Sequence, residues 1–482
     1  MEKIKHNDIK FIFKNIGAIE YAEVPLNDLT MIVGKNSTSK TYLTYIIWGF
    51  LDFINTDNMH FFVNNYIKDI IDSDGTIKNE INMTKFVKEH ISSLILDISS
   101  FYKTNEVHKV IVLPNESLFP NGFDFGVDVA NIHIDYDKDL NINFVIDDIN
   151  VSTIKNIDNL SISVISPDKE KEKQYTNIIA VNIVFQLVKY ILKQIFPQPF
   201  IITSERTGIS IFYRELDTRR SALVEALADT ENKNINKDII MLRSHVSRYP
   251  SPVSRNMQFI RDLFDYYQKS NISQDLKQYM ASKVSKGTYL FDKINNQILY
   301  KIKQGRKVIT LPIYNVSSSV KSLLMLDSYV NYVMQSGQVL IIDEPELNLH
   351  PDNQREVARF LAMLVSSGVR LLFTTHSDYI IKELNNLIML KSLSEDARDY
   401  AIGQIKKETK TEYQSEMFLA KDKVTCIIAK QDGKLGRVKT QIAPINEFGI
   451  DIDIIDREIN YIGETSDILS ELVNVNHRSI GE

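Results

Sequence analysis

Eight consecutive residues near the N-terminus have the types that bind phosphate groups: Gly34, Lys35, Asn36, Ser37, Thr38, Ser39, Lys40 and Thr41. In such a loop, successive backbone N–H groups surround phosphate oxygens, the lysine reaches the terminal phosphates, and the threonine hydroxyl binds Mg²⁺. The stretch fits the phosphate-loop pattern except at Ser39, which stands where a second glycine is usual. Serine is small and polar, so we expect the loop to keep its function. The alternative is an ordinary loop that caps a helix.

Two carboxylates follow an apolar stretch in the C-terminal half. Asp343 and Glu344 come directly after residues 339–342, which have the pattern of a buried strand. The carboxyl ends of such strands are where α/β sheets bind ligands. We expect Asp343 to hold Mg²⁺, directly or through water, and Glu344 to orient or deprotonate an attacking water. The alternative is two acids that merely leave a strand, but Pro345 and residues 348–351 extend the same pattern.

A histidine follows a second apolar strand. His376 lies 33 residues after Asp343, and a helix and a strand fill that interval. This spacing predicts that His376 sits at the end of the neighbouring strand, within reach of a γ-phosphate or its attacking water. A lone histidine is usually structural, so this interpretation depends on the motifs around it.

A run of serines opens a predicted helix 26 residues before Asp343: Ser317, Ser318 and Ser319. Their hydroxyls and the free N–H groups of the helix start can bind an anion. The alternative is plain capping of the helix. The position of the run before Asp343 favours a role in ATP binding.

The segments around these motifs alternate between strand-like and helix-like patterns. A strand at 29–33 leads into the loop, and a helix over 42–51 follows it. The same alternation in the C-terminal half is typical of an α/β fold. The expected strands are 9–13, 22–26, 131–136, 298–302, 308–312, 339–342, 370–375 and 424–430, the last turning at 432–433 into a hairpin, and the other expected helices are 320–333, 353–365 and a final acidic helix.

The motifs divide the chain into one core and two insertions. We predict that residues 1–51 and 285–482 form the core. Residues 52–200 mix helical and strand-like pieces, and residues 201–284 are mostly helical. The first insertion carries no chemical motif, and we expect the second one to serve dimerisation or partner binding.

Composition limits the class of protein. The 56 Lys and Arg residues against 62 Asp and Glu give a net charge of −6, which argues against a globally basic surface for nucleic acid but leaves a local groove open. A single cysteine, Cys426, excludes an intramolecular disulfide and fits a cytoplasmic protein. No apolar stretch of signal-peptide length opens the chain. Residues 178–196 are apolar but carry two lysines, so we expect a core helix and no membrane partner.

Together these motifs resemble those of ABC-type ATPase heads, which structural-maintenance proteins, RecF-like proteins and OLD-family nucleases share. Their order along the chain is the same, over residues 1–50 and 298–385. The resemblance implies an ABC-type P-loop head with helical and β insertions, and ATP and Mg²⁺ as cofactors. It also implies that Ser317 to Ser319 complete the site of a second subunit, so that a homo-oligomer encloses two nucleotides between its heads.

Within this group, the chain is similar to ATPases of bacterial anti-phage operons such as PARIS, Septu and the retron-associated systems. The similarity lies in residues 347–351, 375–379 and 204–206. Those ATPases assemble with a separate effector, often a nuclease, and control it. The resemblance therefore implies a nuclease effector and a phage-encoded trigger protein as partners. For Glu205 and Arg206, a buried ion pair, a nucleotide contact and an interface contact all stay open.

Other members of the group are distinguished by features of the sequence. A chromosome-maintenance protein needs a long heptad repeat, which the segment 52–278 lacks. Asp451 and Asp453 superficially match a Toprim nuclease, but the tail is short and the preceding glutamate-glycine motif is missing, so we predict no nuclease domain. A RecF-like DNA-repair clamp is the serious alternative and would bind DNA through arginines that otherwise form a solvated helix face: Arg243, Arg248, Arg255 and Arg261.

Overall fold

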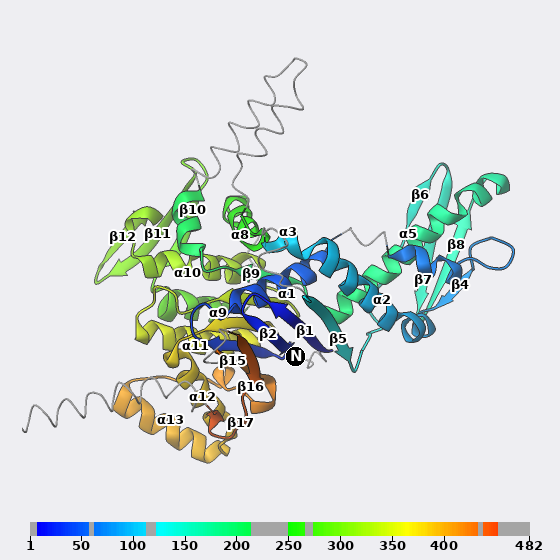
Figure 1. Cartoon of the computed structure of the whole chain (residues 1–482). Helices are drawn as coiled ribbons and strands as arrows, with labels where there is room; N and C mark the ends of the chain where they lie inside the picture. Colours follow the sequence, from blue (N-terminus) through cyan, green and yellow to red (C-terminus); the bar gives the residue numbers. More distant parts are fainter. Residues whose placement is uncertain are drawn as a thin grey trace, which may run out of the picture.

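A computed structural model describes residues 7–56, 62–111, 122–213, 249–265, 273–431 and 437–451. Within these residues, nine strands form one sheet in the order β5-β1-β2-β16-β15-β3-β14-β13-β9. Figure 1 shows this sheet at the centre, with helices on both sides. The α/β architecture predicted from the sequence is confirmed, and it is the one expected for an ABC-type P-loop ATPase head.

Five neighbouring strands run parallel and carry the predicted motifs. They are β9 (Pro199–Ile202), β13 (Val339–Asp343), β14 (Arg370–Thr375), β3 (Leu29–Gly34) and β15 (Val424–Gln431). Because parallel strands end at one edge, this order brings residues 34, 343 and 375 together. The other four sheet strands are β16 (Val438–Ile442), β2 (Ile19–Pro25), β1 (Asp8–Ile16) and β5 (Asp124–Ala130).

The sheet separates two hydrophobic cores. In β3, Ile32 faces one core, while Met31 and Val33 face the other, as the alternation of strand side chains requires. The first core is covered by α1 (Lys40–Asn55), α2 (Met83–Asn105), α3 (Val107–Ile111) and α5 (Lys169–Ile195). The second is covered by α8 (Ser251–Asp262), α9 (Gln274–Tyr279), α10 (Ser318–Ser328), α11 (Pro351–Ser366) and α12 (Asp378–Ser392). Helix α13 (Glu395–Thr409) follows α12 and has no buried residue.

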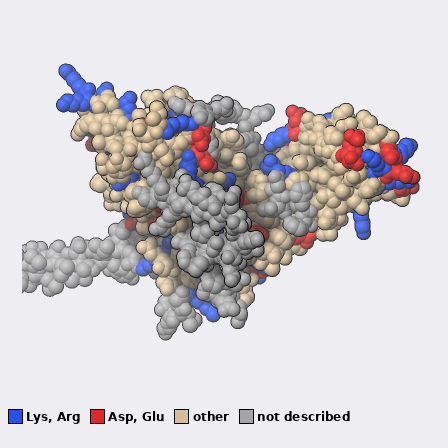
Figure 2. Space-filling model, turned by 90° about the horizontal axis from the view of Figure 1, so that it is seen from above, with Lys and Arg blue, Asp and Glu red and all other residues tan. Residues whose placement is uncertain are grey.

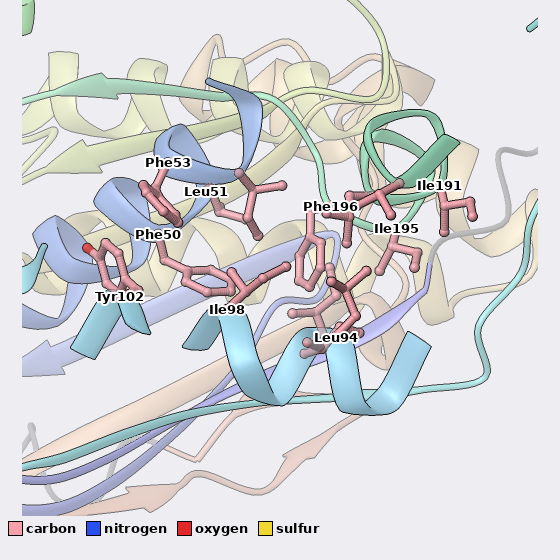
Figure 3. Packing of buried hydrophobic residues seen from close by; sticks show 14 of the residues in the cluster. Phe50, Leu51, Phe53, Leu94, Ile98, Tyr102, Ile191, Ile195 and Phe196 are labelled. Carbon is pink, nitrogen blue, oxygen red and sulfur yellow. The ribbon is translucent and has the colours of Figure 1, made fainter. Parts of the chain in front are cut away.

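Aromatic packing fixes α1 against the inserted helices. Figure 3 shows Phe50 of α1 between Tyr102 of α2 and Phe196, which follows α5. The ring centroid of Phe50 lies 5.4 Å from that of Tyr102 and 5.7 Å from that of Phe196. The Tyr102 hydroxyl donates to the carbonyl of Ile46, so α2 is also hydrogen-bonded to α1. This contact supports the helix that follows the phosphate loop.

Three small sheets complete the described fold. An arm in Figure 1 projects away from the main sheet and contains β4 (Glu80–Asn82), β6 (Phe144–Ile146), β7 (Ile149–Asn156) and β8 (Asn159–Ile165). Charges of both signs gather at its tip in Figure 2. A second sheet contains β10 (Thr288–Asp292), β11 (Gln297–Gln304) and β12 (Lys307–Pro312), and a third β17 (Ile445–Asn446) and β18 (Gly449–Ile450).

One predicted strand is wrong. Residues 131–136 are irregular, whereas the strand is β5, which pairs with β1 and ends at Ala130. Asn131 has a φ of 52°, a left-handed conformation that ends the ladder despite the continuing apolar alternation. The predicted helix 320–333 begins two residues earlier and changes to a π-helical turn at Tyr329–Val333. The turn at 432–433 and the final acidic helix lie outside the described residues.

The predicted insertions share strands with the main sheet. Strand β5 lies within the first insertion and forms one edge of the sheet, and β9 at its end forms the other. The domain boundaries therefore stay a prediction. The apolar stretch 178–196 lies mostly in α5, which packs Ile183, Val184 and Leu187 into the core. Among the described residues, α5 is also the one helix long and apolar enough to cross a membrane, and 56% of its most apolar window is buried inside the protein.

Candidate nucleotide site

The phosphate loop joins β3 to α1, as the sequence predicts. Ser37 and Ser39 have φ values of 63° and 65°, so two residues of the loop adopt the left-handed conformation. Such a backbone forms a concave set of N–H groups that binds anions. In the described part of the chain, the backbone N–H groups of Asn36, Ser37 and Ser39 donate to no other group. The loop therefore fits a phosphate.

The structure explains how serine replaces the usual glycine. Ser39 occupies the left-handed conformation that a glycine would adopt without strain. Its hydroxyl oxygen accepts a hydrogen bond from the Ala18 N–H at 3.0 Å. Gly17 makes room for it, because a Cβ at position 17 would lie only 2.5 Å from the Ser39 Oγ. The departure at Ser39 is thus accommodated by the turn between β1 and β2.

Lys40 is buried at the loop, with 6% of its surface exposed. Its Nζ donates to the carbonyls of Gly34 at 2.7 Å and Lys35 at 2.8 Å. Burial lowers the pKa of Lys40, while the charges of Glu344 and Asp343 act in the opposite direction. The ammonium group is held by its own loop, where it can exchange these carbonyls for phosphate oxygens.

Asp343 and Thr41 come together from opposite halves of the chain. The Thr41 hydroxyl lies 3.2 and 3.1 Å from the two carboxylate oxygens of Asp343. Asp343 is 2% exposed, and burial raises the pKa of its carboxyl. No group of three or more His, Cys, Asp or Glu residues suited to a metal occurs among the described residues. A hydroxyl and one carboxylate suit Mg²⁺, which takes its other ligands from phosphate and water.

Glu344 and His376 face each other at the ends of neighbouring strands. Strand β13 pairs with β14 so that Asp343 lies beside Thr374, which places His376 as predicted. Its Nδ1 lies 3.6 Å from a Glu344 carboxylate oxygen. The contact lowers the pKa of Glu344 and raises the pKa of His376. Glu344 is therefore ionised near neutral pH, as an acceptor for a proton of water must be.

Two residues that sequence reasoning missed hold this pair. The Thr374 hydroxyl donates to Asp343 at 2.5 Å and accepts from the Glu344 N–H at 3.1 Å. Glu346 is 5% exposed and accepts from the His376 N–H and the Thr375 hydroxyl, each at 2.9 Å. Thr374 lies in the predicted strand 370–375 and Glu346 directly precedes residues 347–351, so their proximity in sequence to Glu344 and His376 was the available signal.

Glu205 and Arg206 do not form the buried ion pair that the sequence left open. Arg206 is 2% exposed, and its guanidinium donates to backbone carbonyls. Glu205 is exposed and accepts from the Tyr45 hydroxyl at 3.2 Å. Its negative charge contributes to the raised pKa of Asp343. Both residues therefore belong to the surroundings of the nucleotide site.

The serine run begins α10 but does not join its own phosphate loop. Ser317 caps the helix, accepting from the Val320 N–H, and its hydroxyl lies 2.8 Å from that of Ser319. Ser317 and Ser318 are exposed, and Ser319 is partly exposed. Among the described residues, no hydrogen bond links these three hydroxyls to residues 34–41.

Only two of the four arginines of the DNA-clamp alternative lie in the described part of the chain. Arg243 and Arg248 lie outside the described residues. Arg255 and Arg261 both lie on α8, but six helical positions place them about 120° apart around its axis. Arg255 is exposed and Arg261 only partly so. The described part of the chain gives no basic stripe from them.

A cavity of about 900 Å³ lies at the opposite end of the sheet. Gln338, just before β13, and Arg370, at the start of β14, line it. The cavity is therefore separate from the predicted nucleotide site.

Comparison with protein families gives a match to the AAA ATPase domain over residues 9–381. No curated protein matches the chain. Solved structures similar to it include the Smc head domain with an extended coiled coil bound to the C-terminal domain of ScpA from Pyrococcus furiosus (12% identity, 97% of this chain and 99% of that one, TM-score 0.35). The SmcHead bound to the C-winged helix domain of ScpA has 10% identity over 91% and 98% of the chains, with a TM-score of 0.35. The SMC head domain from Thermotoga maritima has 11% identity over 92% and 100%, with a TM-score of 0.31.

The family match spans more than half of the chain, and the Thr41 hydroxyl of the phosphate loop lies beside the Asp343 carboxylate at the end of β13. The chain belongs to the AAA ATPase domain family and is an ATPase.

Proposed function

We propose that two copies of this ATPase pair through ABC-type heads and enclose ATP and Mg²⁺ between them. The observation that carries the proposal is the position of Ser317 and Ser318, which are exposed at the start of α10 and not engaged with the phosphate loop of their own chain. An exposed helix start that carries serine hydroxyls is suited to bind phosphate oxygens. A second copy would supply the nucleotide that they bind.

Each predicted residue then has a role. The loop from Gly34 to Ser39 and the Lys40 ammonium hold the phosphates, and Thr41 with Asp343 holds Mg²⁺. Glu344 accepts a proton from the attacking water or orients it, and His376 keeps the Glu344 carboxylate in place and reaches the γ-phosphate. The contacts between Thr41 and Asp343 and between His376 and Glu344 support these roles.

We also propose that the paired ATPase acts in the cytoplasm as the control subunit of an anti-phage defence complex. Its effector would be a separate protein, a nuclease, and a phage-encoded protein would trigger it. Residues 204–206, 347–351 and 375–379 support this role through their similarity to ATPases of such operons. The projecting arm with β4 and β6 to β8 offers a surface away from the nucleotide site for a partner.

Solution mass tests the pairing. Glu344→Gln should bind ATP without hydrolysing it, so light scattering after gel filtration should give an even-numbered oligomer with ATP and Mg²⁺. Adding Ser318→Arg should abolish this ATP-dependent assembly because the bulky cation blocks the partner's nucleotide. Ser394→Arg, at the exposed start of α13, is the matched control and should leave assembly intact. A monomer under all conditions would refute the composite site.

Phage challenge tests the defence role. Cells carrying the gene with its neighbouring genes should resist infection, and Glu344→Gln should remove the resistance. Equal plaque counts with and without the genes, across a panel of phages, would reject the defence proposal while leaving the ATPase intact.

A further inference from the structure

A single buried arginine joins three parts of the nucleotide site. Arg206 follows β9 and donates from Nη1 to the carbonyl of Asp343 at 2.8 Å, and from Nη2 to the carbonyl of Glu344 at 2.6 Å. Its Nε donates to the carbonyl of Ser322 in α10 at 3.1 Å. A further bond from Nη1 reaches Thr203 at 3.2 Å. The end of β13, the end of β9 and α10 are therefore held by one side chain.

The chemistry of the site requires arginine. A guanidinium group is planar and has five N–H donors in a fixed fork, whereas a lysine ammonium is a single point with three. Burial lowers the pKa of Arg206 to about 10, against the opposing effect of Asp343, Glu346 and Glu344. The group thus stays charged at neutral pH, and its bonds to carbonyls are charge-assisted.

The arginine fixes the backbone of the proposed water-orienting residue. Glu344 has a φ of 50°, an unfavourable conformation for a residue with a side chain. Its N–H is held by the carbonyl and hydroxyl of Thr374, and its carbonyl is held by Arg206. With both sides of the residue anchored, the carboxylate is directed at His376.

The same arginine is connected to the serine run. Ser322, whose carbonyl accepts from Arg206, donates its hydroxyl to the carbonyl of Ser319 at 2.8 Å. Ser319 lies in the first turn of α10, next to the exposed Ser317 and Ser318. A displacement of α10 would therefore pull directly on the group that positions Glu344.

We infer that Arg206 is a positioning residue that fixes the Glu344 carboxylate relative to α10. Binding of the partner's nucleotide to the serines on α10 is thereby transmitted to Glu344, so each site of a pair becomes hydrolytically active when the other is filled. The positioning role needs only the ATPase activity, whereas the coupling between sites rests on the proposed pairing.

A double-mutant cycle in the rate of hydrolysis tests the positioning role. Arg206→Lys should lower kcat on the order of 100-fold, since misplacing a reacting group by about 1 Å has an effect of that size. The Kd for ATP should change less than about threefold, because Arg206 donates to no residue of the phosphate loop. In the Glu344→Gln background, measured by single turnover, Arg206→Lys should have almost no further effect. If Arg206→Lys lowered kcat by the same factor in the Glu344→Gln background as in the wild type, the inference would be overturned.

Matched variants separate positioning from general damage. Arg370→Lys replaces a second buried arginine, 3% exposed, that donates to a backbone carbonyl at the other end of the sheet. It should leave kcat within about twofold of the wild type. Arg206→Gln, a smaller neutral side chain with two N–H donors, is a second variant and should reproduce the low kcat with retained ATP binding. If Arg206→Lys and Arg206→Gln instead lost ATP binding and kcat together, Arg206 would be a merely structural residue.

Cooperativity tests the coupling. The wild-type rate should rise with ATP concentration with a Hill coefficient above 1, and Arg206→Lys should bring it to 1. An unchanged coefficient above 1 in Arg206→Lys would overturn the coupling. If the wild type shows no ATP-dependent pairing, the proposed function fails instead, and the kcat cycle still decides the positioning role.

Discussion

Substituting Gly17 should weaken ATP binding although it lies outside the phosphate loop. An added Cβ would lie 2.5 Å from the Ser39 Oγ and 3.2 Å from the Ser39 Cβ. Residue 17 itself has a φ of 54°, a backbone conformation that disfavours any side chain. Gly17→Ala therefore has two separate effects, one on the backbone at residue 17 and one on Ser39.

The two effects differ in their consequence for the ligand. The left-handed backbone costs about 1–2 kcal/mol, but this strain is present with and without ATP and cancels in the binding free energy. Steric crowding of a packed position costs about 1–3 kcal/mol. It would push Ser39 out of the conformation that forms the N–H cradle. If about 1–2 kcal/mol of the crowding falls on the binding-competent loop, the Kd for ATP rises roughly 5- to 30-fold.

A fluorescent ATP analogue gives the Kd for four proteins: wild type, Gly17→Ala, Ser39→Gly and the double variant. Ser39→Gly removes the Oγ and Cβ that the new methyl group meets, so Gly17→Ala should change the Kd less than about threefold in that background. Gly75→Ala is the control, because Gly75 has a φ of 75° and nothing lies within 4 Å of its added Cβ. An equal loss of affinity in both backgrounds would show that Ser39 does not transmit the effect.

Three further predictions concern the carboxylates and their partners. Thr374→Val removes the hydrogen bonds to Asp343 and the Glu344 N–H, so kcat should fall about 10- to 100-fold, equivalent to about 1–3 kcal/mol, while Thr374→Ser should retain most activity in a steady-state assay. Thr41→Val should raise the Mg²⁺ concentration for half-maximal rate about tenfold, and Thr41→Ser should not; equal requirements would remove Thr41 from the metal site. Because contact with Glu344 raises the pKa of His376 above 6.5, the stabilising charge pair is present below pH 6.5 and lost as pH rises through that raised pKa. Glu344→Gln should therefore lower the pKa of His376 in an NMR titration, and an unchanged value would contradict the assigned contact.

The local parts of the site could be predicted from sequence because neighbouring residues determine them. The strand, loop and helix around Lys40 follow from periodicity and residue type within a short segment. The placement of His376 beside Glu344 also succeeded, since one helix between two buried strands normally brings their ends together in a parallel sheet. The sequence also predicts a strand at 424–430, and Cys426 lies there in β15 with no exposed surface.

Contacts that depend on strand order were not predicted. Arg206 reaches Glu344 because β9 pairs with β13, and 137 residues separate Arg206 from Asp343. Nothing in the local pattern of β9 identifies β13 as its neighbour. The error at 131–136 has the opposite origin, because an alternating pattern continued past Asn131 although the backbone of that residue ends the ladder. Alternation describes which side chains could share a face and does not require a partner strand.

Ser39 shows why a departure from a motif must be judged in three dimensions. In sequence, the serine only lowers the match to the phosphate-loop pattern. In the structure, its left-handed backbone, its hydrogen bond from Ala18 and the missing side chain at Gly17 form one arrangement. The hydrogen bond contributes about 1 kcal/mol, which is comparable to the strain of a left-handed serine. A loop without the second glycine is thus sustained by a turn 21 residues away in sequence, so the two positions should be read as one feature of the site.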